Sequence, residues 1–434
     1  MMICAMKNIK NLSLNKKLLL TALILVLYRG MSHIPLPFVN SEFIKSVFED
    51  NTSMGMLNLL TGGNLESMSI VAMGITPYIT ASIVIQLLGV CFPSIANMQK
   101  EGSTGQEKIK KATIILGAVL GLMQGVSMMY VYGKQGLLVE VNWFTILIPA
   151  IIMTLGVRFL SFLGQYMTDN LFGNGVSLIL VTGILCSYLK DGGMLYGALT
   201  VGHTQNEKIF NIALAIISIF VLFAFTIWLM YCEKRVNIIY SGKVKSDADS
   251  IATESYIPIK LVGGSVVPVI FAASIMTIPT LIESFMKTGN KWFNIFDMTK
   301  WLNPDYTYAN IGILIYFALI IAFSYYYQAL NLNETELAVT LKKRGGVIEN
   351  VRPGKPTELY LKKEMRVLTL AGAFGLCVVA TIPICVTGLL GLGRLSFLGT
   401  SIIIVVSVML DLGDRYIAAR KNEKYKKKGC YLGA

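Results

Sequence analysis

The chain has 434 residues, of which 54% are hydrophobic and 15% charged, and its mean hydropathy is +0.62. This composition is too apolar for a soluble globular protein of that length and is typical of a chain that crosses a membrane many times. The formal net charge is +13. The sequence has no basic stripe with interleaved aromatic residues, so the charge alone gives no reason to expect nucleic-acid binding.

Ten apolar runs along the sequence are long enough, at about 1.5 Å per helical residue, to cross a hydrocarbon layer of about 30 Å. We therefore predict ten spanning helices, at residues 18–36, 69–91, 112–132, 143–164, 175–194, 209–231, 261–282, 308–331, 367–390 and 395–413. They divide into an N-terminal half, 18–195, and a C-terminal half, 205–413, joined by an outside loop near 191–208. Five spans per half place the halves in opposite orientations, as in inverted repeats.

Basic residues predict the orientation of these spans. With the N-terminus inside, the segments facing the cytoplasm contain 28 Lys and Arg residues, and those facing outward contain 8. An excess of basic residues marks cytoplasmic loops. Both tails, 1–17 and 414–434, and the two large loops, 232–260 and 332–366, are therefore expected in the cytoplasm.

The second span carries more polar residues than a lipid-facing anchor needs, namely Thr76, Pro77, Thr80, Ser82 and Gln86. It follows a short amphipathic stretch, about 54–68, that is too short and too polar to span. Irregular backbone at membrane depth must be buried in protein or lie against water. The pair therefore predicts helices folded around a cavity.

These residues also carry a family resemblance. Residues 74–83 (GITPYITASI) resemble the second transmembrane segment of the SecY/Sec61-alpha family of protein-conducting channels. Further ordered motifs that resemble the family lie at 58–63 (NLLTGG), 173–175 (GNG), 267–272 (VPVIFA), 352–357 (RPGKPT) and 399–406 (GTSIIIVV). The chain is identified on these motifs as a somewhat divergent member of that family.

The resemblance implies an all-α integral membrane protein with ten helices in two inverted five-helix halves around a central pore. It implies a ring of aliphatic side chains at the waist of the pore: Ile75, Ile79, Leu180, Ile270 and Ile404. An apolar constriction of this kind gates by dewetting. The plug that the family places in the pore falls on a half-helix at about 54–68, with Asn58, Thr61, Gly62 and Gly63.

The resemblance also implies a lateral gate and a docking loop. Gate positions fall on Thr80, Gln86, Gln124 and Val262. Since the family usually has Asn at the last of these, its replacement by Val should weaken hydrogen bonding between helices by about 1 kcal/mol or less. The contact for a motor or ribosome falls on Arg352, Pro353 and Gly354. Segments 165–172 and 245–250 depart from the usual family pattern.

The implied function is translocation of unfolded preproteins across the cytoplasmic membrane, with lateral release of transmembrane segments into it. The implied partners are SecE and SecG-type subunits, the SecA ATPase or the ribosome, preproteins with signal peptides, and membrane lipid. Neither a small-molecule substrate, a cofactor nor a catalytic residue is expected. An accessory SecY with restricted substrates and a secondary transporter with inverted repeats remain alternatives.

Two observations concern the possibilities that the chain is an ion-coupled transporter or binds a metal. The centres of the spans are almost free of Asp, Glu, Lys and Arg, whereas ion-coupled transporters need ionisable groups at the midplane. The seven cysteines are scattered, without the spacing of a metal site, so no metal is expected.

Overall fold

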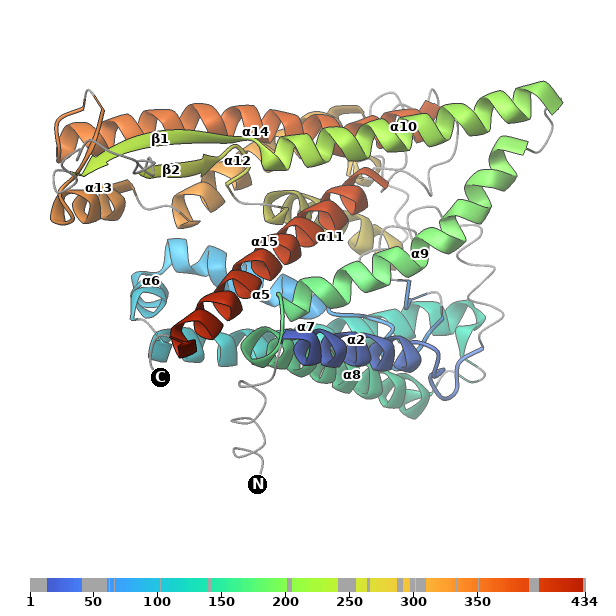
Figure 1. Cartoon of the computed structure of the whole chain (residues 1–434). Helices are drawn as coiled ribbons and strands as arrows, with labels where there is room; N and C mark the ends of the chain where they lie inside the picture. The colour runs from blue at the N-terminus through green and yellow to red at the C-terminus, as the bar shows by residue number, and fades with distance from the viewer. Residues whose placement is uncertain are drawn as a thin grey trace.

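A computed structural model provides the fold of the chain (Figure 1). It describes residues 14–40 and 61–431, apart from 62, 66, 102, 139, 141, 201–204, 241–254, 264–265, 287–291, 297–300, 302–309, 332–333, 350 and 390–397. Residues 1–13 of the predicted N-terminal tail, the segment 245–250 and the plug residues Asn58 and Gly62 lie outside the described residues.

The protein is mostly helical. The N-terminal half consists of α2 (Leu14–Met31), α5 (Thr76–Cys91), α6 (Pro93–Lys100), α7 (Ser103–Tyr132), the π-helical turn η1 (Gly133–Leu137), α8 (Trp143–Asn170) and α9 (Gly175–Thr200). The C-terminal half consists of α10 (Gln205–Tyr231), β1 (Glu233–Tyr240), β2 (Ser255–Lys260), α11 (Val267–Met286), η2 (Phe293–Ile295), α12 (Ile311–Asn331), α13 (Glu334–Lys343), β3 (Gly346–Ile348), α14 (Lys355–Leu389) and α15 (Leu398–Tyr431).

Each of the ten predicted spans overlaps one of these helices. By length and composition, four stretches of described helix can cross a membrane: one each in α7, α8 and α14, and one that begins in α12. Shorter apolar helices occur in α5, α9, α10 and α11. The membrane-protein fold class therefore agrees with the sequence, while the count of ten crossings remains a prediction.

Several predicted boundaries differ from the ends of the observed helices. The second span begins at Thr76 and not at residue 69, because residues 69–75 form turns and Gly74 has φ +57°. The first span ends at Met31 instead of residue 36. The connection between the halves is also not a loop over 191–208, since α9 continues to Thr200 and α10 begins at Gln205.

The two halves lie on opposite sides of the molecule. In Figure 1, α2, α7 and α8 gather on the lower side, α10 and α14 lie on the upper side, and α15 crosses between them. Helix α15 packs against both α9 and α10, which are the last helix of one half and the first of the other. The largest apolar cluster includes buried residues of α5 and α9 as well as α11, α12, α14 and α15. The core therefore joins the two halves.

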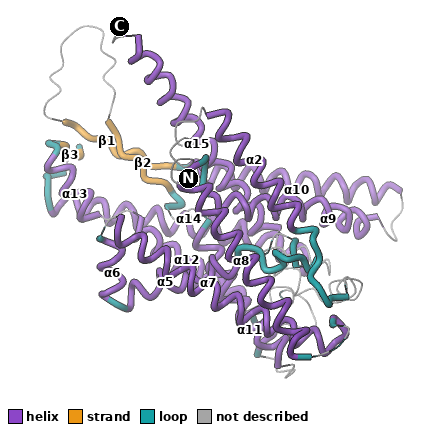
Figure 2. The backbone as a smooth tube through the Cα atoms, turned by 90° about the horizontal axis from the view of Figure 1, so that it is seen from below, coloured by secondary structure: helices purple, strands orange, loops and turns teal. Residues whose placement is uncertain are grey.

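A small sheet stands at one end of the helical body (Figure 2), where the sequence predicted only cytoplasmic loops. Its strand order is β2-β1-β3, and β1 is antiparallel to both neighbours. Alternate residues of the strands, including Val236 and Ile259, pack against Leu361 of α14, which explains why this segment folds. Lys234 lies 2.6 Å from Glu364, and the hydrogen bond to this carboxylate raises the pKa of Lys234.

Candidate functional site

The side chains predicted for the pore ring come mostly together. Leu180 on α9 and Ile404 on α15 belong to the same buried apolar cluster, with 6% and 3% of their surface exposed. Ile79 on α5 and Ile270 on α11 are half-buried and pack against it. Four helices, two from each half, therefore contribute these aliphatic side chains to one large apolar cluster, and their arrangement as a ring stays a prediction.

Ile75 occupies a different position from the other four. It is the N-cap of α5, and its carbonyl oxygen accepts the hydrogen bond from the backbone N–H of Ile79 at 3.1 Å. Its side chain is buried in a neighbouring cluster with Tyr28, Leu160 and Ile179. Ile79 packs against both clusters, so it links Ile75 to the rest of the predicted ring.

Of the predicted plug, residues 61, 63–65, 67 and 68 are described, and they form turns and a bend, not the half-helix expected from the sequence. Thr61 is 7% exposed, and Gly63 has φ +76°, which favours glycine. A Cβ atom on Gly63 would lie 2.5 Å from Oγ of Ser187 on α9. Close packing against α9, as well as flexibility, therefore accounts for a glycine at this position.

Asn64 ties the segment to the end of α2. Its side chain is fully buried, and its Nδ2 donates to the Tyr28 hydroxyl and to the Thr61 carbonyl oxygen, both at 2.8 Å. Ser67 donates from its Oγ to the carbonyl oxygen of Ser32 at 3.0 Å. A buried amide with satisfied hydrogen bonds fixes its neighbours, because leaving one unpaired is expensive.

Tyr28 and Asn64 were not among the residues that the sequence analysis singled out. Tyr28 lies inside an apolar run, where its hydroxyl is the only unusual feature, and Asn64 lies in a polar stretch. A lone polar group in a span is a weak signal for an interhelical hydrogen bond. Their pairing across 36 residues of sequence required the structure.

The predicted gate residues have different surroundings. The Thr80 hydroxyl donates to the Thr76 carbonyl oxygen at 3.1 Å, within its own helix. Gln86 instead accepts hydrogen bonds from Tyr326 and Tyr327 of α12, in the other half. Gln124 is half-buried on α7. Among these positions, Gln86 is therefore the one with recorded hydrogen bonds between the halves.

Val262 is 8% exposed and belongs to the large apolar cluster. A Cβ atom on Gly372 of α14 would lie 3.4 Å from Cγ2 of Val262, so this side chain packs next to α14. An apolar residue suits that position, because a buried amide there would need its own hydrogen-bond partners.

The predicted docking residues lie on an exposed turn between β3 and α14. Arg352 and Pro353 are exposed, and Gly354 has φ +109°, a conformation that L-residues rarely adopt. The Arg352 carbonyl oxygen accepts a 2.9 Å hydrogen bond from the Thr357 hydroxyl in the first turn of α14. The backbone of the turn is thus held in place while the Arg352 side chain faces outward.

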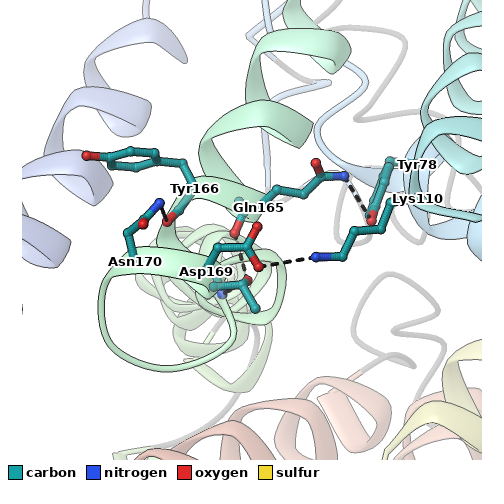
Figure 3. Close-up of polar contacts among 9 residues, drawn as sticks. Tyr78, Lys110, Gln165, Tyr166, Asp169 and Asn170 are labelled. Atoms are coloured by element: carbon teal, nitrogen blue, oxygen red, sulfur yellow. Dashed lines mark hydrogen bonds and ion pairs between the residues drawn. The ribbon is translucent and has the colours of Figure 1, made fainter. Parts of the chain in front are cut away.

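A further polar group lies at the end of α8, in the segment 165–172 that departs from the family pattern (Figure 3). Gln165 donates to the Tyr78 hydroxyl of α5 at 3.4 Å. Lys110 of α7 lies 3.2 Å from the Asp169 carboxylate. These contacts join three helices of the N-terminal half to one another. Within the described residues, no group of three or more His, Cys, Asp or Glu could hold a metal ion.

Comparisons with known proteins agree with this arrangement. The family model described as SecY matches residues 69–413. The protein translocase subunit SecY of Bacillus subtilis (strain 168) is 35% identical over 412 residues, which cover 92% of this chain and 92% of that protein.

Two solved structures share the fold at low sequence identity. A structure described as a protein conducting channel has a TM-score of 0.69 at 18% identity and covers 95% of this chain and 94% of its own. Sec61 in the canine ribosome-channel complex from the endoplasmic reticulum has a TM-score of 0.65 at 18% identity, with the same coverage. With the family model spanning most of its length, the chain belongs to the SecY family.

Proposed function

We propose that this chain forms the protein-conducting channel of a translocase, through which unfolded preproteins cross the membrane and transmembrane segments leave laterally into lipid. The observation that supports the proposal is that Ile79, Leu180, Ile270 and Ile404, from four helices of both halves, all belong to or pack against one apolar cluster. An apolar constriction excludes water and ions when closed, and it fits around an extended chain without binding a particular sequence.

The membrane is proposed to be the cytoplasmic membrane, with both termini in the cytoplasm. This orientation rests on the excess of basic residues in the predicted inside segments. The sheet β2-β1-β3, α13 and the Arg352 turn then lie together on the cytoplasmic side. That side is where a partner that delivers preprotein has to dock.

The proposed partners are SecE and SecG-type subunits and either the SecA ATPase or a ribosome. The ribosome is supported by the similarity to Sec61 of a ribosome-channel complex. The energy for translocation would come from the partner, and we assign no catalytic residue to this chain. Substrate recognition would fall on signal peptides and lipid, with no small-molecule substrate.

The two alternatives are less well supported. Relatives named simply as the protein translocase subunit SecY match over 92% and 93% of the chain, which does not favour an accessory role. An ion-coupled transporter would need ionisable side chains at the midplane. The apolar cluster that includes or contacts Ile79, Leu180, Ile270 and Ile404 contains aliphatic and aromatic side chains and none of Asp, Glu, Lys or Arg among its described members.

Site-specific photo-crosslinking of a trapped preprotein tests the channel directly. A photo-crosslinking amino acid replaces Ile79 or Ile404, and a preprotein with a folded C-terminal domain is arrested during translocation into proteoliposomes. We expect both positions to crosslink to the arrested chain. Ile217 on α10 is 59% exposed and serves as the control, because we expect it to face lipid. Crosslinks at Ile217 but at neither Ile79 nor Ile404 would refute the proposed path.

Charge reversal at Arg352 tests the docking site. Arg352→Glu should leave the stability within about 0.5 kcal/mol, since surface substitutions away from packed features have small effects. It should nevertheless abolish partner-driven translocation, because the charge presented to the partner is reversed. The control is Lys355→Glu, which makes the same change at another exposed position nearby. Full translocation by Arg352→Glu, with unchanged protein level, would exclude this turn as the contact.

A further inference from the structure

One residue of α5, Gln86, accepts hydrogen bonds from two consecutive residues of α12, one through its backbone and one through its side chain. The Tyr326 hydroxyl donates to the backbone carbonyl oxygen of Gln86 at 2.8 Å. The Tyr327 hydroxyl donates to Oε1 of the same residue. Helix α5 belongs to the N-terminal half and α12 to the C-terminal half, so both bonds join the halves.

The geometry of Gln86 is fixed from its other side as well. Its Nε2 donates to Oγ of Ser82, one turn earlier in α5, at 3.0 Å. This bond orients the amide so that Oε1 faces α12 and can accept from Tyr327. The side chain of Gln86 therefore uses both ends of its amide, one within α5 and one across to the other half.

The two tyrosine rings are held in place by aromatic packing. The ring of Tyr327 lies edge-on to Phe271 of α11, with centroids 5.0 Å apart, and edge-on to Tyr326 at 5.5 Å. Phe271 also packs against Phe323, one turn before Tyr327 on α12. Edge-to-face pairs at these distances are favourable. The hydroxyl groups are thus aimed at α5 by a rigid aromatic group of α11 and α12.

We propose that Gln86, Tyr326 and Tyr327 form a clasp that holds the halves together and sets how strong a signal peptide must be to separate them. The inference rests on the proposed function and names additional residues that determine its specificity. The tyrosines of α12 donate the hydrogen bonds that join the halves in this clasp. Val262, at a predicted gate position, has no polar side chain with which to do so.

The physical basis is the loss of hydrogen bonds when α5 and α12 move apart. Tyr327 is 7% exposed, so in the closed arrangement its hydroxyl is bonded to Gln86 in surroundings that hold little water. Side-chain hydrogen bonds between membrane helices each shift an equilibrium by about threefold on average. Removal of both hydroxyls should therefore raise the ratio of open to closed channels by about tenfold.

The variants Tyr326→Phe, Tyr327→Phe and the double variant remove the hydroxyls and keep the aromatic packing. The matched control is Tyr325→Phe, because the Tyr325 hydroxyl donates to the Arg366 carbonyl oxygen of α14, within one half, at 3.2 Å. Gln86→Leu removes the side-chain acceptor of Tyr327 and keeps the backbone acceptor of Tyr326, and combining it with Tyr327→Phe completes a double-mutant cycle.

Two measurements are made on the full complex. The first is the distance between two spin labels, one at Phe92 directly after α5 and one at Ala329 in α12, both exposed positions. The labels are attached to a chain from which the native cysteines have been removed, and the complex is measured in lipid nanodiscs. The second is translocation of a preprotein with an intact signal peptide and of one with a weakened signal peptide.

We expect the double variant to show a longer label distance in a larger fraction of molecules and about tenfold more translocation of the weakened preprotein. Tyr325→Phe should match the unmodified chain in both measurements. The effects of Gln86→Leu and Tyr327→Phe on translocation of the weakened preprotein should be non-additive, because both variants remove the same hydrogen bond. Label distances and signal stringency that are the same in the double variant and Tyr325→Phe would overturn the clasp. If the unmodified chain translocated neither preprotein, the proposed function would fail, while the label distances would still test the clasp.

Discussion

Helices α5 and α11 occupy equivalent places in the two halves, and they begin in the same way. Each has a proline in its first turn, Pro77 in α5 and Pro268 in α11, where a missing N–H is tolerated. Each also begins later than its apolar run predicts. The side chains with which they contact Tyr327 of α12 differ: α5 contributes the amide of Gln86, and α11 contributes the ring of Phe271.

The segments that lead into the two helices differ more. Before α5, the described residues between 61 and 75 form mostly buried turns, and Asn64 ties them to α2. Before α11, Leu261 follows β2 directly and donates its backbone N–H to the Cys232 carbonyl oxygen. The comparison indicates that the entrance to α5 is fixed by backbone and buried polar contacts, whereas the entrance to α11 is fixed by the sheet.

The glycines before the two helices give the largest predicted difference. A Cβ on Gly74 would lie 2.7 Å from the Thr61 carbonyl oxygen, and the residue has φ +57°. Gly74→Ala should therefore cost about 2–4 kcal/mol, from left-handed strain and from overpacking against backbone. Gly263→Ala should cost about 1–2 kcal/mol, because Gly263 lacks the positive φ and its Cβ would meet the end of the buried Gln328 side chain, not the backbone.

Thermal unfolding of the two variants in one detergent measures this difference. Gly30→Ala in α2 is the control, because a Cβ there has nothing within 4 Å. An equal loss of stability at positions 74 and 263 would contradict the view that the entrance to α5 is the more rigid of the two.

Asparagine at the equivalent ring positions should produce the next largest effect. Ile79→Asn on α5 and Ile270→Asn on α11 each place an amide where both isoleucines pack against the same apolar cluster. A polar side chain favours wetting of an apolar constriction, so ion leak should rise about tenfold, which corresponds to about 1.4 kcal/mol. The measurement is ion flux through proteoliposomes that hold the resting channel. Leak from only one of the two variants would show that the helices do not share a ring.

The sequence predicted the fold class, because apolar runs and ordered motifs are local signals, while the pore ring stays a prediction. It missed the sheet, since 232–260 and 332–366 are polar and their short strands come together only around Leu361 of α14. It also missed Tyr28 as the partner of Asn64 and the tyrosines that bond Gln86. Such pairs depend on how helices far apart in sequence are placed, which periodicity does not encode.

The smallest effect is expected at Thr80, which the family resemblance places at the gate. Its hydroxyl donates to the Thr76 carbonyl oxygen in the same helix, so no recorded bond to the other half is lost in Thr80→Val. The two side chains have similar shapes, and the carbonyl oxygen keeps its helical hydrogen bond. We therefore expect less than about 0.5 kcal/mol of change in stability and less than about a twofold change in translocation of a weakened preprotein. Tyr327→Phe, measured in the same assay, should raise translocation of the weakened preprotein more than Thr80→Val does, because the hydrogen bond of Tyr327 joins the halves. A loss of signal stringency in Thr80→Val as large as that in Tyr327→Phe would show that Thr80 acts across the gate once the halves begin to separate.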